Sequence, residues 1–329
     1  MSPETARPTA AATLSLTGRY YRQGTEAAEA LRLWAEQAGI SLVLIDDAGS
    51  AEAVIRAYSE WIGNVDLLIG PYASGLVREI APLFRDSGQL LWNHGGSADD
   101  LAQPMVASLA APASSYLCGV VEIAASHGIG HIVIVQGPGP FARAVADGAA
   151  NRAREQGLHV QQTGAAAIDK LETPEAAWLL AGHFEHDVDV ARRLRNGRPQ
   201  PPLIAAVAAG IRAFGGELGG EANGIYGPAQ WWPDKSVPAV APAGTDFFRA
   251  YQARTGQEPS YVAAQAAAAG FLASEAHRRQ LTATDVSHWD TSTLLGSFRL
   301  DANWRQVGHR ITTVRWQDGQ LVRAELPPP

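Results

Sequence analysis

The sequence is poor in the features that form disulfides, metal sites and membrane spans. Cys118 is the single cysteine among 329 residues, which excludes an intramolecular disulfide and a cysteine-based metal site. No apolar run approaches the ~20 residues that cross a bilayer, so we expect no direct membrane insertion. The start of the chain also lacks the basic and apolar regions of a secretory signal. We expect a periplasmic or extracytoplasmic protein if a signal was removed, and a cytoplasmic one if Met1 is the native start.

Positive charge is scarce as well. The net charge is −7, and no basic stripe with interleaved aromatic residues occurs, so we expect no nucleic-acid partner. The chain does contain 46% hydrophobic and 18% charged residues, which is the composition of a globular protein. Because 329 residues exceed one core of ordinary size, the length predicts two domains.

Short apolar runs alternate with amphipathic helical patterns along most of the chain. This alternation is typical of βαβ units and predicts an α/β fold with parallel sheets. It starts anew after Pro112, so we expect two similar lobes. The expected strands are 13–16, 41–45, 66–69, 89–92, 131–136, 158–163, 177–181 and 202–207. The expected helices are 25–38, 50–62, 74–86, 114–126, 140–156, 185–195, 245–255 and 261–279.

The last third of the chain changes in character. Residues 226–242 are rich in Pro and aromatic residues, which predicts that regular structure stops there. The expected helix 261–279 is rich in Ala, which indicates close helix packing. Residues 310–325 alternate around Asp318-Gly319, a strong hairpin signal. Strands that return after helices predict that the chain passes between the lobes more than once.

One motif is compatible with an enzyme. Residues 137–142 follow an expected strand and fit the dinucleotide-binding pattern G-x-G-x-x-A. However, the next strand ends in Gln and Thr at 161–163, without the acidic residue that binds a ribose. Pro138 and Pro140 also remove backbone donors that a pyrophosphate would use. We expect no cofactor and no enzymatic activity, and an NAD(P)-dependent α/β enzyme remains the alternative from another class.

One cluster deserves a test as a metal site. His183, Glu185, His186 and Asp187 lie within five residues, and two of them are imidazoles three positions apart. Acidic residues also favour helix N-termini for electrostatic reasons, and these four stand where a helix should begin. We therefore expect helix capping and ligand contact there, and no metal.

Small hydroxyl residues and glycines follow two neighbouring strands of the first expected sheet. Ser74 lies in the segment after residues 66–69, and Asn93, Gly95 and Ser97 follow residues 89–92. In open parallel sheets ligands bind beyond the carboxyl ends of strands, where free N–H groups favour negative charge. These two loops predict a cradle for a carboxylate or amide. Ser74 also suits a helix N-cap, which would expose neighbouring amides.

Several segments resemble one receptor family over nearly the whole chain. Their order and spacing are similar to those of the leucine/isoleucine/valine-binding family of type I periplasmic binding proteins. The segments are Ser15–Gly18 with Gly24, Leu68–Pro71 with Ser74-Gly75, Leu91–Leu101, Glu258–Ala267, Gly296–Asp301, Gln306–His309 and Val314–Gly319.

The resemblance implies two Rossmann-like lobes joined by three crossings of the chain. The crossings are expected near Ala111, near residues 230–234 and near His309. Lobe 1 would then comprise residues 1–111 plus 236–309, and lobe 2 residues 112–235 plus 310–329. The family's members close their two lobes over a small molecule.

The resemblance also implies roles for individual residues. Ser74, Gly95 and Ser97 match first-lobe positions that bind a ligand carboxylate, and Asn93 lies in the same loop. Phe141 stands where many members carry a Tyr, so its ring can pack on a ligand but cannot donate a hydrogen bond. Further wall positions fall at Tyr20, Tyr21, Gln23 and His183 or Phe184. The candidate aromatic lining is Tyr20, Tyr21, Tyr72, Trp92, Tyr116, Phe141 and Trp231.

One departure from the family concerns the ligand's charge. Members that bind α-amino acids hold the ammonium with an acidic residue after the strand that here is 202–207, but this loop reads Ala208-Ala209-Gly210. A buried ammonium without a carboxylate partner is costly by several kcal/mol. Unless Glu185 or Asp187 substitutes, we expect a carboxylate or amide ligand, with Ala209 facing it, and not a free α-amino acid.

The resemblance implies the receptor of an ABC transporter, with a small-molecule ligand, a permease as partner and a monomeric state. A cytoplasmic or signalling-linked sensor of the same fold, similar to the amide sensors, is the alternative within the family.

Overall fold

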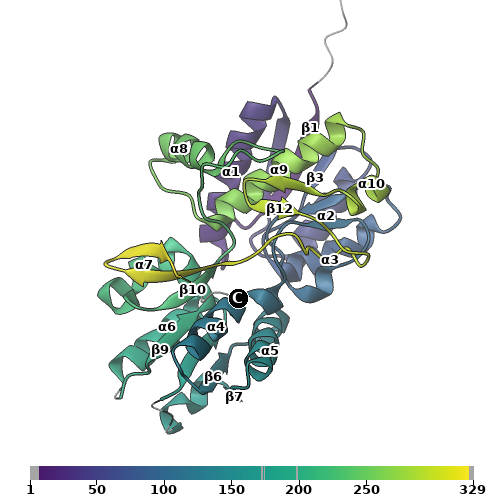
Figure 1. Ribbon diagram of the computed structural model, residues 1–329. Coiled ribbons are helices and arrows are strands. Elements are labelled where there is room, and N and C mark those ends of the chain that lie inside the picture. The colour runs from purple at the N-terminus through teal and green to yellow at the C-terminus, as the bar shows by residue number, and fades with distance from the viewer. Residues whose placement is uncertain (1–6, 172, 174, 198, 326–329) are drawn as a thin grey trace, which may run out of the picture. The chain divides into compact units, whose positions relative to one another are not determined.

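The computed structural model describes residues 7–171, 173, 175–197 and 199–325 (Figure 1). The chain divides into two compact units, which we call lobe 1 (1–111 and 230–310) and lobe 2 (112–229 and 311–329). The chain passes between them at 111/112, 229/230 and 310/311, and the sequence led us to expect crossings near Ala111, near residues 230–234 and near His309. Each lobe holds a sheet in which parallel pairing dominates, and the expected α/β class is confirmed.

The lobe 1 sheet is parallel throughout and runs in the order β2-β1-β3-β4-β5. Strand β1, which pairs with β2 and β3, begins at Thr9, four residues before the expected start. The cause is that residues 10–12 are alanines, which are fully buried here but are weak strand formers. The three-residue strand β5 was not expected. The strands are β1 (Thr9–Leu14), β2 (Ser41–Asp46), β3 (Leu67–Ile69), β4 (Leu91–Asn93) and β5 (Val106–Ser108).

Helices cover the lobe 1 sheet, and α1 lies beside the Ala-rich α9 (Figure 1). A Cβ atom at Gly270 of α9 would lie 2.3 Å from the Trp34 ring of α1. Trp34 Nε1 also donates to the Ser274 hydroxyl at 3.0 Å, so small residues on α9 let one large ring pack between the helices. The helices are α1 (Tyr21–Ala38), α2 (Ala51–Trp61), α3 (Ser74–Phe84), α8 (Gly244–Thr255), α9 (Tyr261–Arg278) and α10 (Ala283–Ser287), and a small hairpin joins β11 (Thr291–Thr293) to β12 (Gly296–Phe298).

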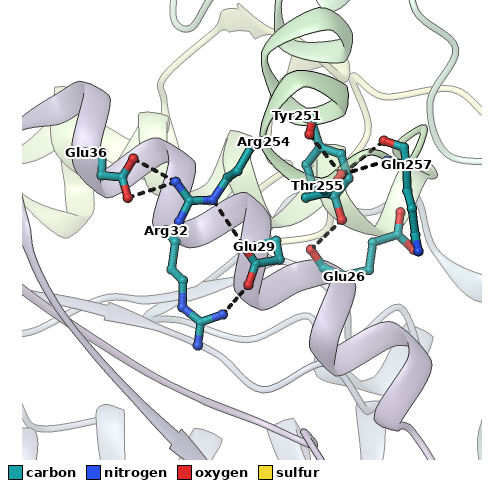
Figure 2. Close-up of polar contacts among 8 residues, drawn as sticks. All are labelled: Glu26, Glu29, Arg32, Glu36, Tyr251, Arg254, Thr255 and Gln257. Carbon is teal, nitrogen blue, oxygen red and sulfur yellow. Dashed lines mark hydrogen bonds and ion pairs between the residues drawn. The ribbon is translucent and has the colours of Figure 1, made fainter.

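Polar contacts connect α1 to α8 (Figure 2). The Arg254 guanidinium donates to Glu29 at 3.0 Å through Nε and to Glu36 at 2.7 and 2.8 Å through Nη1. Glu29 also pairs with Arg32 of its own helix. These hydrogen bonds and charges lower the pKa of Glu29 against the opposing effect of its desolvation. The network ties the late helix to the first helix of the chain.

The lobe 2 sheet runs in the order β14-β13-β10-β9-β8-β6-β7. Its strands from β7 to β10 pair in parallel, and β13 and β14 add an antiparallel edge. The strands are β6 (His131–Gln136), β7 (His159–Thr163), β8 (Ala177–Ala181), β9 (Leu203–Ala206), β10 (Tyr226–Ala229), β13 (Thr312–Gln317) and β14 (Gln320–Arg323). The expected hairpin is confirmed: both residues of its turn, Asp318 and Gly319, have positive φ.

Strand β10 corrects one expectation. Residues 226–242 were expected to lack regular structure because of their Pro and aromatic content, yet Tyr226–Ala229 pairs with β13 along its whole length. Pro228 is tolerated because β10 pairs with β9 only at Tyr226 to Ala205, so the ladder on that side does not need its missing N–H. The remaining residues, 230–242, contain no helix or strand, as expected.

Apolar side chains fill both faces of the lobe 2 sheet. The expected helix 114–126 is split into a 3₁₀ turn at Ala113–Ser115 and helix α4 (Cys118–Ser126). The other helices are α5 (Pro140–Glu155), α6 (Phe184–Asn196) and α7 (Arg212–Leu218). Within the described ranges, no helix combines the length and apolar character needed to cross a membrane.

Candidate functional site

The two Ser- and Gly-containing loops of lobe 1 touch each other beyond the ends of β3 and β4. A Cβ atom at Gly95 would lie 2.5 Å from the Tyr72 carbonyl oxygen, so only glycine permits this approach. The approach brings Tyr72 and Ser74, after β3, next to Gly95 and Ser97, after β4. We call residues 72–74 and 93–98 the lobe 1 cradle.

Ser74 organises the cradle through its hydroxyl oxygen. This oxygen accepts hydrogen bonds from the backbone N–H groups of Ser97 at 3.1 Å and Ala98 at 3.2 Å. The expectation that Ser74 caps its own helix is wrong: the N-cap of α3 is Ala73, and no side chain caps it. The Ser74 hydroxyl, in the first turn of α3, therefore binds the amides of the neighbouring loop and not those of its own helix.

Asn93 lies inside the cradle loop and is fully buried. Its side-chain oxygen accepts from the Gly96 N–H at 2.8 Å, and its amide group donates to the Gly96 carbonyl at 2.6 Å and to the Ser108 hydroxyl at 2.8 Å. These bonds close the turn that displays Gly95 and Ser97. In this structure Asn93 shapes the loop from beneath.

Aromatic rings border the cradle. Tyr72 has ring-centroid distances of 6.2 Å to both Tyr20 and His94. Tyr21, the first residue of α1, is 48% exposed and lies under the Arg22 guanidinium. Gln23 is partly exposed on the same turn. The structure thus brings Tyr20 and Tyr72 together and leaves Tyr21 the most open of the three.

His94 was not expected among the site residues, although it stands between Asn93 and Gly95. It is fully buried, and neither ring nitrogen makes a full hydrogen bond within the described part of the chain. Burial lowers the pKa of His94 to about 4, and the nearby Gly70 backbone offsets this only in part. His94 is therefore a neutral ring beneath the cradle. A histidine inside a Gly-rich loop was the signal available in the sequence.

Three expected residues of lobe 2 meet in one aromatic cluster. The Tyr116 and Phe141 rings are 5.5 Å apart in an edge-to-face arrangement. His183, the N-cap of α6, stacks on Phe141 with a centroid distance of 6.3 Å and an interplanar angle of 22°. The cluster borders the carboxyl ends of β6 and β8, the edge at which parallel sheets bind ligands.

The acidic candidates of α6 differ sharply in environment. Glu185 is exposed, whereas Asp187 is fully buried. Asp187 Oδ2 accepts from the Ala208 N–H at 3.0 Å, and its Oδ1 lies 3.1 Å from His186 Nδ1. Burial raises the pKa of Asp187, against the opposing effect of these hydrogen bonds and the neighbouring imidazole. Both carboxylate oxygens are thus engaged within lobe 2.

The loop after β9 is itself buried. It forms a 3₁₀ turn, Val207–Gly210, and Ala209 packs in the lobe 2 core while its carbonyl accepts from Trp316 Nε1 at 2.9 Å. Two expected lining rings are likewise packed inside lobe 1, Trp92 against Phe298 and Trp231 against Phe247. Among the described residues, no group of three or more His, Cys, Asp or Glu side chains could hold a metal ion.

Comparison with known proteins identifies the family. The profile described as "Periplasmic binding protein" matches residues 9–179, just over half of the chain. The chain belongs to the periplasmic binding protein family. No curated protein matches the sequence.

Solved structures share the fold of this periplasmic binding protein over nearly its whole length. The leucine-binding protein LivK of Thermotoga maritima has a TM-score of 0.82 and 16% identity, covering 98% of this chain and 99% of its own. LivJ of Streptococcus pneumoniae, solved with isoleucine, has a TM-score of 0.79 and 15% identity, covering 98% and 100%. A solute-binding protein of Rhodopseudomonas palustris, solved with benzoate, has a TM-score of 0.78 and 15% identity, covering 98% and 96%.

Family membership decides between two of the expected classes. Periplasmic binding proteins bind solutes and are not enzymes, so the NAD(P)-dependent alternative for residues 137–142 falls away. That loop instead leads from β6 into α5 and carries Phe141 to the aromatic cluster.

Proposed function

We propose that this periplasmic binding protein is the solute receptor of an ABC transporter and that it binds a small organic carboxylate or amide with an apolar or aromatic body. Free α-amino acids are not its ligands. The proposed location is extracytoplasmic, the proposed partner is the transporter's permease, and the receptor acts as a monomer.

The observation that carries the ligand class is the state of Asp187. The turn after β9 contains no acidic side chain, and Asp187, which contacts this turn, is hydrogen-bonded to the Ala208 N–H and to His186. Glu185 points its charge to solvent. An ammonium buried here would lack a free carboxylate partner, at a cost of several kcal/mol. We therefore propose that free α-amino acids do not bind to this receptor.

One side of the ligand's carboxylate or amide group is assigned to lobe 1, and its other side stays available to a donor of lobe 2. The cradle places the hydroxyls of Ser74 and Ser97 beside Gly95, and hydroxyl donors stabilise an anion through short, charge-assisted hydrogen bonds. The Ser97 and Ala98 N–H groups donate to Ser74 and hold the loop in place. Tyr20 and Tyr72 supply apolar surface at its border. In lobe 2, Tyr116, Phe141 and His183 form a stacking surface that suits a flat or apolar body. The R. palustris relative solved with benzoate is a precedent for this chemistry in the fold.

Binding is proposed to favour the closed receptor. A ligand shifts such an equilibrium only by its difference in affinity between the open and closed states. Contacts to both lobes would provide that difference, and closure would then mark the loaded receptor for the permease.

A thermal-shift panel tests the proposal. Benzoate, benzamide, isobutyrate, leucine and phenylalanine are added at equal concentration, because a ligand bound only by the native state raises the melting temperature. We expect benzoate or benzamide to stabilise the protein and both amino acids to have no effect. Stabilisation by leucine or phenylalanine, without an effect of any carboxylate or amide, would overturn the proposed ligand class.

A further inference from the structure

His186 stands at the lobe 2 edge where ligands of parallel sheets bind. Its ring lies against two glycines: a Cβ atom at Gly182 would be 2.1 Å from His186 Nδ1, and one at Gly137 would be 3.4 Å from its Cδ2. Gly137 follows β6 and Gly182 follows β8, so the ring is packed on the carboxyl ends of two neighbouring strands. At Gly182 a side chain would collide with the imidazole, so only glycine permits this approach there, whereas the contact at Gly137 is an ordinary van der Waals distance.

The two ring nitrogens of His186 differ in their hydrogen bonding. Nδ1 lies 3.1 Å from Asp187 Oδ1, whereas Nε2 is buried and has no hydrogen-bond partner within the described residues. The side chain as a whole is 16% exposed, so the ring edge is near the surface of the lobe. A buried polar atom without a partner is uncommon in native proteins and is a place where a water molecule or a ligand atom can bind.

Asp187 determines what Nε2 can do. When the pair has lost its shared proton, the carboxylate accepts from Nδ1–H and Nε2 carries only a lone pair. When the pair gains one proton, Nε2 carries hydrogen whether that proton sits on the imidazole or on the carboxyl group. The donor character of Nε2 therefore depends on the charge of the pair and not on where within it the proton lies.

We propose that the His186–Asp187 pair is the lobe 2 element that recognises an anionic group of the ligand, with His186 Nε2–H as donor and Asp187 as the positioning residue. This inference rests on the proposed function and deepens it: the ligand carries a carboxylate, and its binding is coupled to uptake of one proton by the pair. Binding of a neutral amide is not coupled to proton uptake. The amide can donate a hydrogen bond to Nε2 when it carries a lone pair, and can accept one from Nε2–H when it carries hydrogen.

Few other charges face the pair. The segments packed on it, Gly137, Gly182 and the 207–210 turn, carry no titratable side chain. On α6, Glu185 is exposed and His183 stacks on Phe141. Helix α7, which packs against α6, begins with Arg212, whose side chain is exposed. Among the described residues, His186 and Asp187 are thus the ionisable side chains in direct contact with each other at this edge.

Calorimetric titration with benzoate and benzamide, from pH 5.5 to 8.5 and in buffers of different ionisation heat, tests the inference. In the wild-type protein we expect benzoate affinity to fall up to tenfold per pH unit above the ionisation of the pair, with uptake of up to one proton, and benzamide affinity to stay constant. His186→Gln keeps an amide near the Nε2 position but cannot titrate, so its benzoate binding should be independent of pH and at least tenfold weaker at pH 5.5.

Two further variants separate the pair from its surroundings. In Asp187→Asn the side-chain amide can donate to Nδ1 while its oxygen still accepts from Ala208, which leaves a neutral ring with Nε2–H. We expect this variant to fold and to bind benzoate without the pH dependence. His127→Gln, an exposed histidine of the same lobe, should behave as wild type. Proton uptake that persists in His186→Gln but is lost in His183→Gln would overturn the inference.

The outcomes distinguish the two proposals. Tight benzoate binding without proton uptake, equal in wild type and His186→Gln, leaves the receptor function standing, overturns the inference and indicates a bound water at Nε2. If no carboxylate or amide binds, the proposed ligand class fails. In that case ¹⁵N NMR of the histidines still tests whether Asp187 positions His186. An Nδ1–H tautomer of His186 at high pH supports the inference, and an Nε2–H tautomer overturns it.

Discussion

Ser74 and Ser97 come from different loops, yet the hydroxyl oxygen of Ser74 lies 3.1 Å from the backbone nitrogen of Ser97 and accepts its hydrogen bond. The same oxygen accepts from Ala98 at 3.2 Å. One side chain thus sets the position of the lobe 1 cradle.

Ser74→Ala removes the acceptor for both amides. Since an amide deprived of its partner costs about 1–3 kcal/mol, we expect lower stability and at least tenfold weaker benzoate binding, measured by urea denaturation and calorimetry. Ser50→Ala is the matched control, because Ser50 caps α2 in the same lobe through the Ala53 N–H. It should lower stability by about 1 kcal/mol and leave affinity unchanged. Equal affinity of Ser74→Ala and wild type would refute the role of the cradle.

Acid should destabilise lobe 1 through two buried histidines. Burial lowers the pKa values of His94 and His309 to about 4, below the ordinary value of 6.5. Between these pH values the unfolded chain binds more protons than the folded one. The stability associated with the two neutral histidines is therefore complete above pH 6.5 and is lost as the pH falls toward 4. Each ring accounts for on the order of 3 kcal/mol.

Denaturation of wild type and His94→Gln at pH 7.5, 6.0 and 5.0 measures this effect. The variant should show a shallower loss of stability with falling pH, whereas the exposed His127→Gln should follow wild type. Parallel curves for His94→Gln and wild type would contradict the assigned neutral state of His94.

Gly270 has no room for a side chain. In Gly270→Ala the new methyl group would meet the Trp34 ring at 2.3 Å, and overpacking of this kind costs about 1–3 kcal/mol. Gly75→Ala in α3 is the control, since no atom lies within 4 Å of its Cβ position and alanine favours helix by up to ~1 kcal/mol. Thermal unfolding should shift down for the first variant and not for the second. An unchanged melting temperature of Gly270→Ala would argue against close packing of α1 on α9.

Arg254 should contribute a modest, salt-sensitive amount to stability. It is 27% exposed and contacts both Glu29 and Glu36 (Figure 2), so we expect Arg254→Ala to cost about 1 kcal/mol at low salt and less in 1 M NaCl. Arg249→Ala removes only an exposed pair with Asp246 and should have almost no effect. A loss that is equal at both salt concentrations would point to packing of the Arg254 stem as the cause.

Local patterns in the sequence predicted most of the elements but not their limits. Strand β8 and the hairpin around Asp318-Gly319 were predicted correctly, because buried apolar runs and turn residues act over a few positions. Strand β1 was displaced because residues 10–12 are alanines, whose strand state depends on burial between β2 and β3. Strand β10 was missed because Pro228 is acceptable only where its neighbour β9 has already stopped pairing.

For the candidate site, too, the sequence predicted residue types but not the contacts that they make. Residue types after the strands indicated Ser74, Gly95, Ser97, Phe141 and His183, and whether each contacts a ligand stays a prediction. Which polar atoms are already engaged depends on contacts between segments far apart in the chain, such as Asp187 with Ala208 or Ser74 with Ser97. No spacing rule in a single sequence encodes those distances.

The sequence by itself determined the α/β class, the two lobes and the absence of an acidic residue at 208–210, since these follow from periodicity and composition. Only the tertiary structure decided that Asp187 is buried and hydrogen-bonded, that Glu185 is exposed, and that His186 Nε2 has no hydrogen-bond partner in the part of the chain that the structure describes. The physical reason is that burial and hydrogen bonding depend on three-dimensional neighbours: two carboxylates two residues apart on one helix turn face opposite environments, one the lobe's core and the other water.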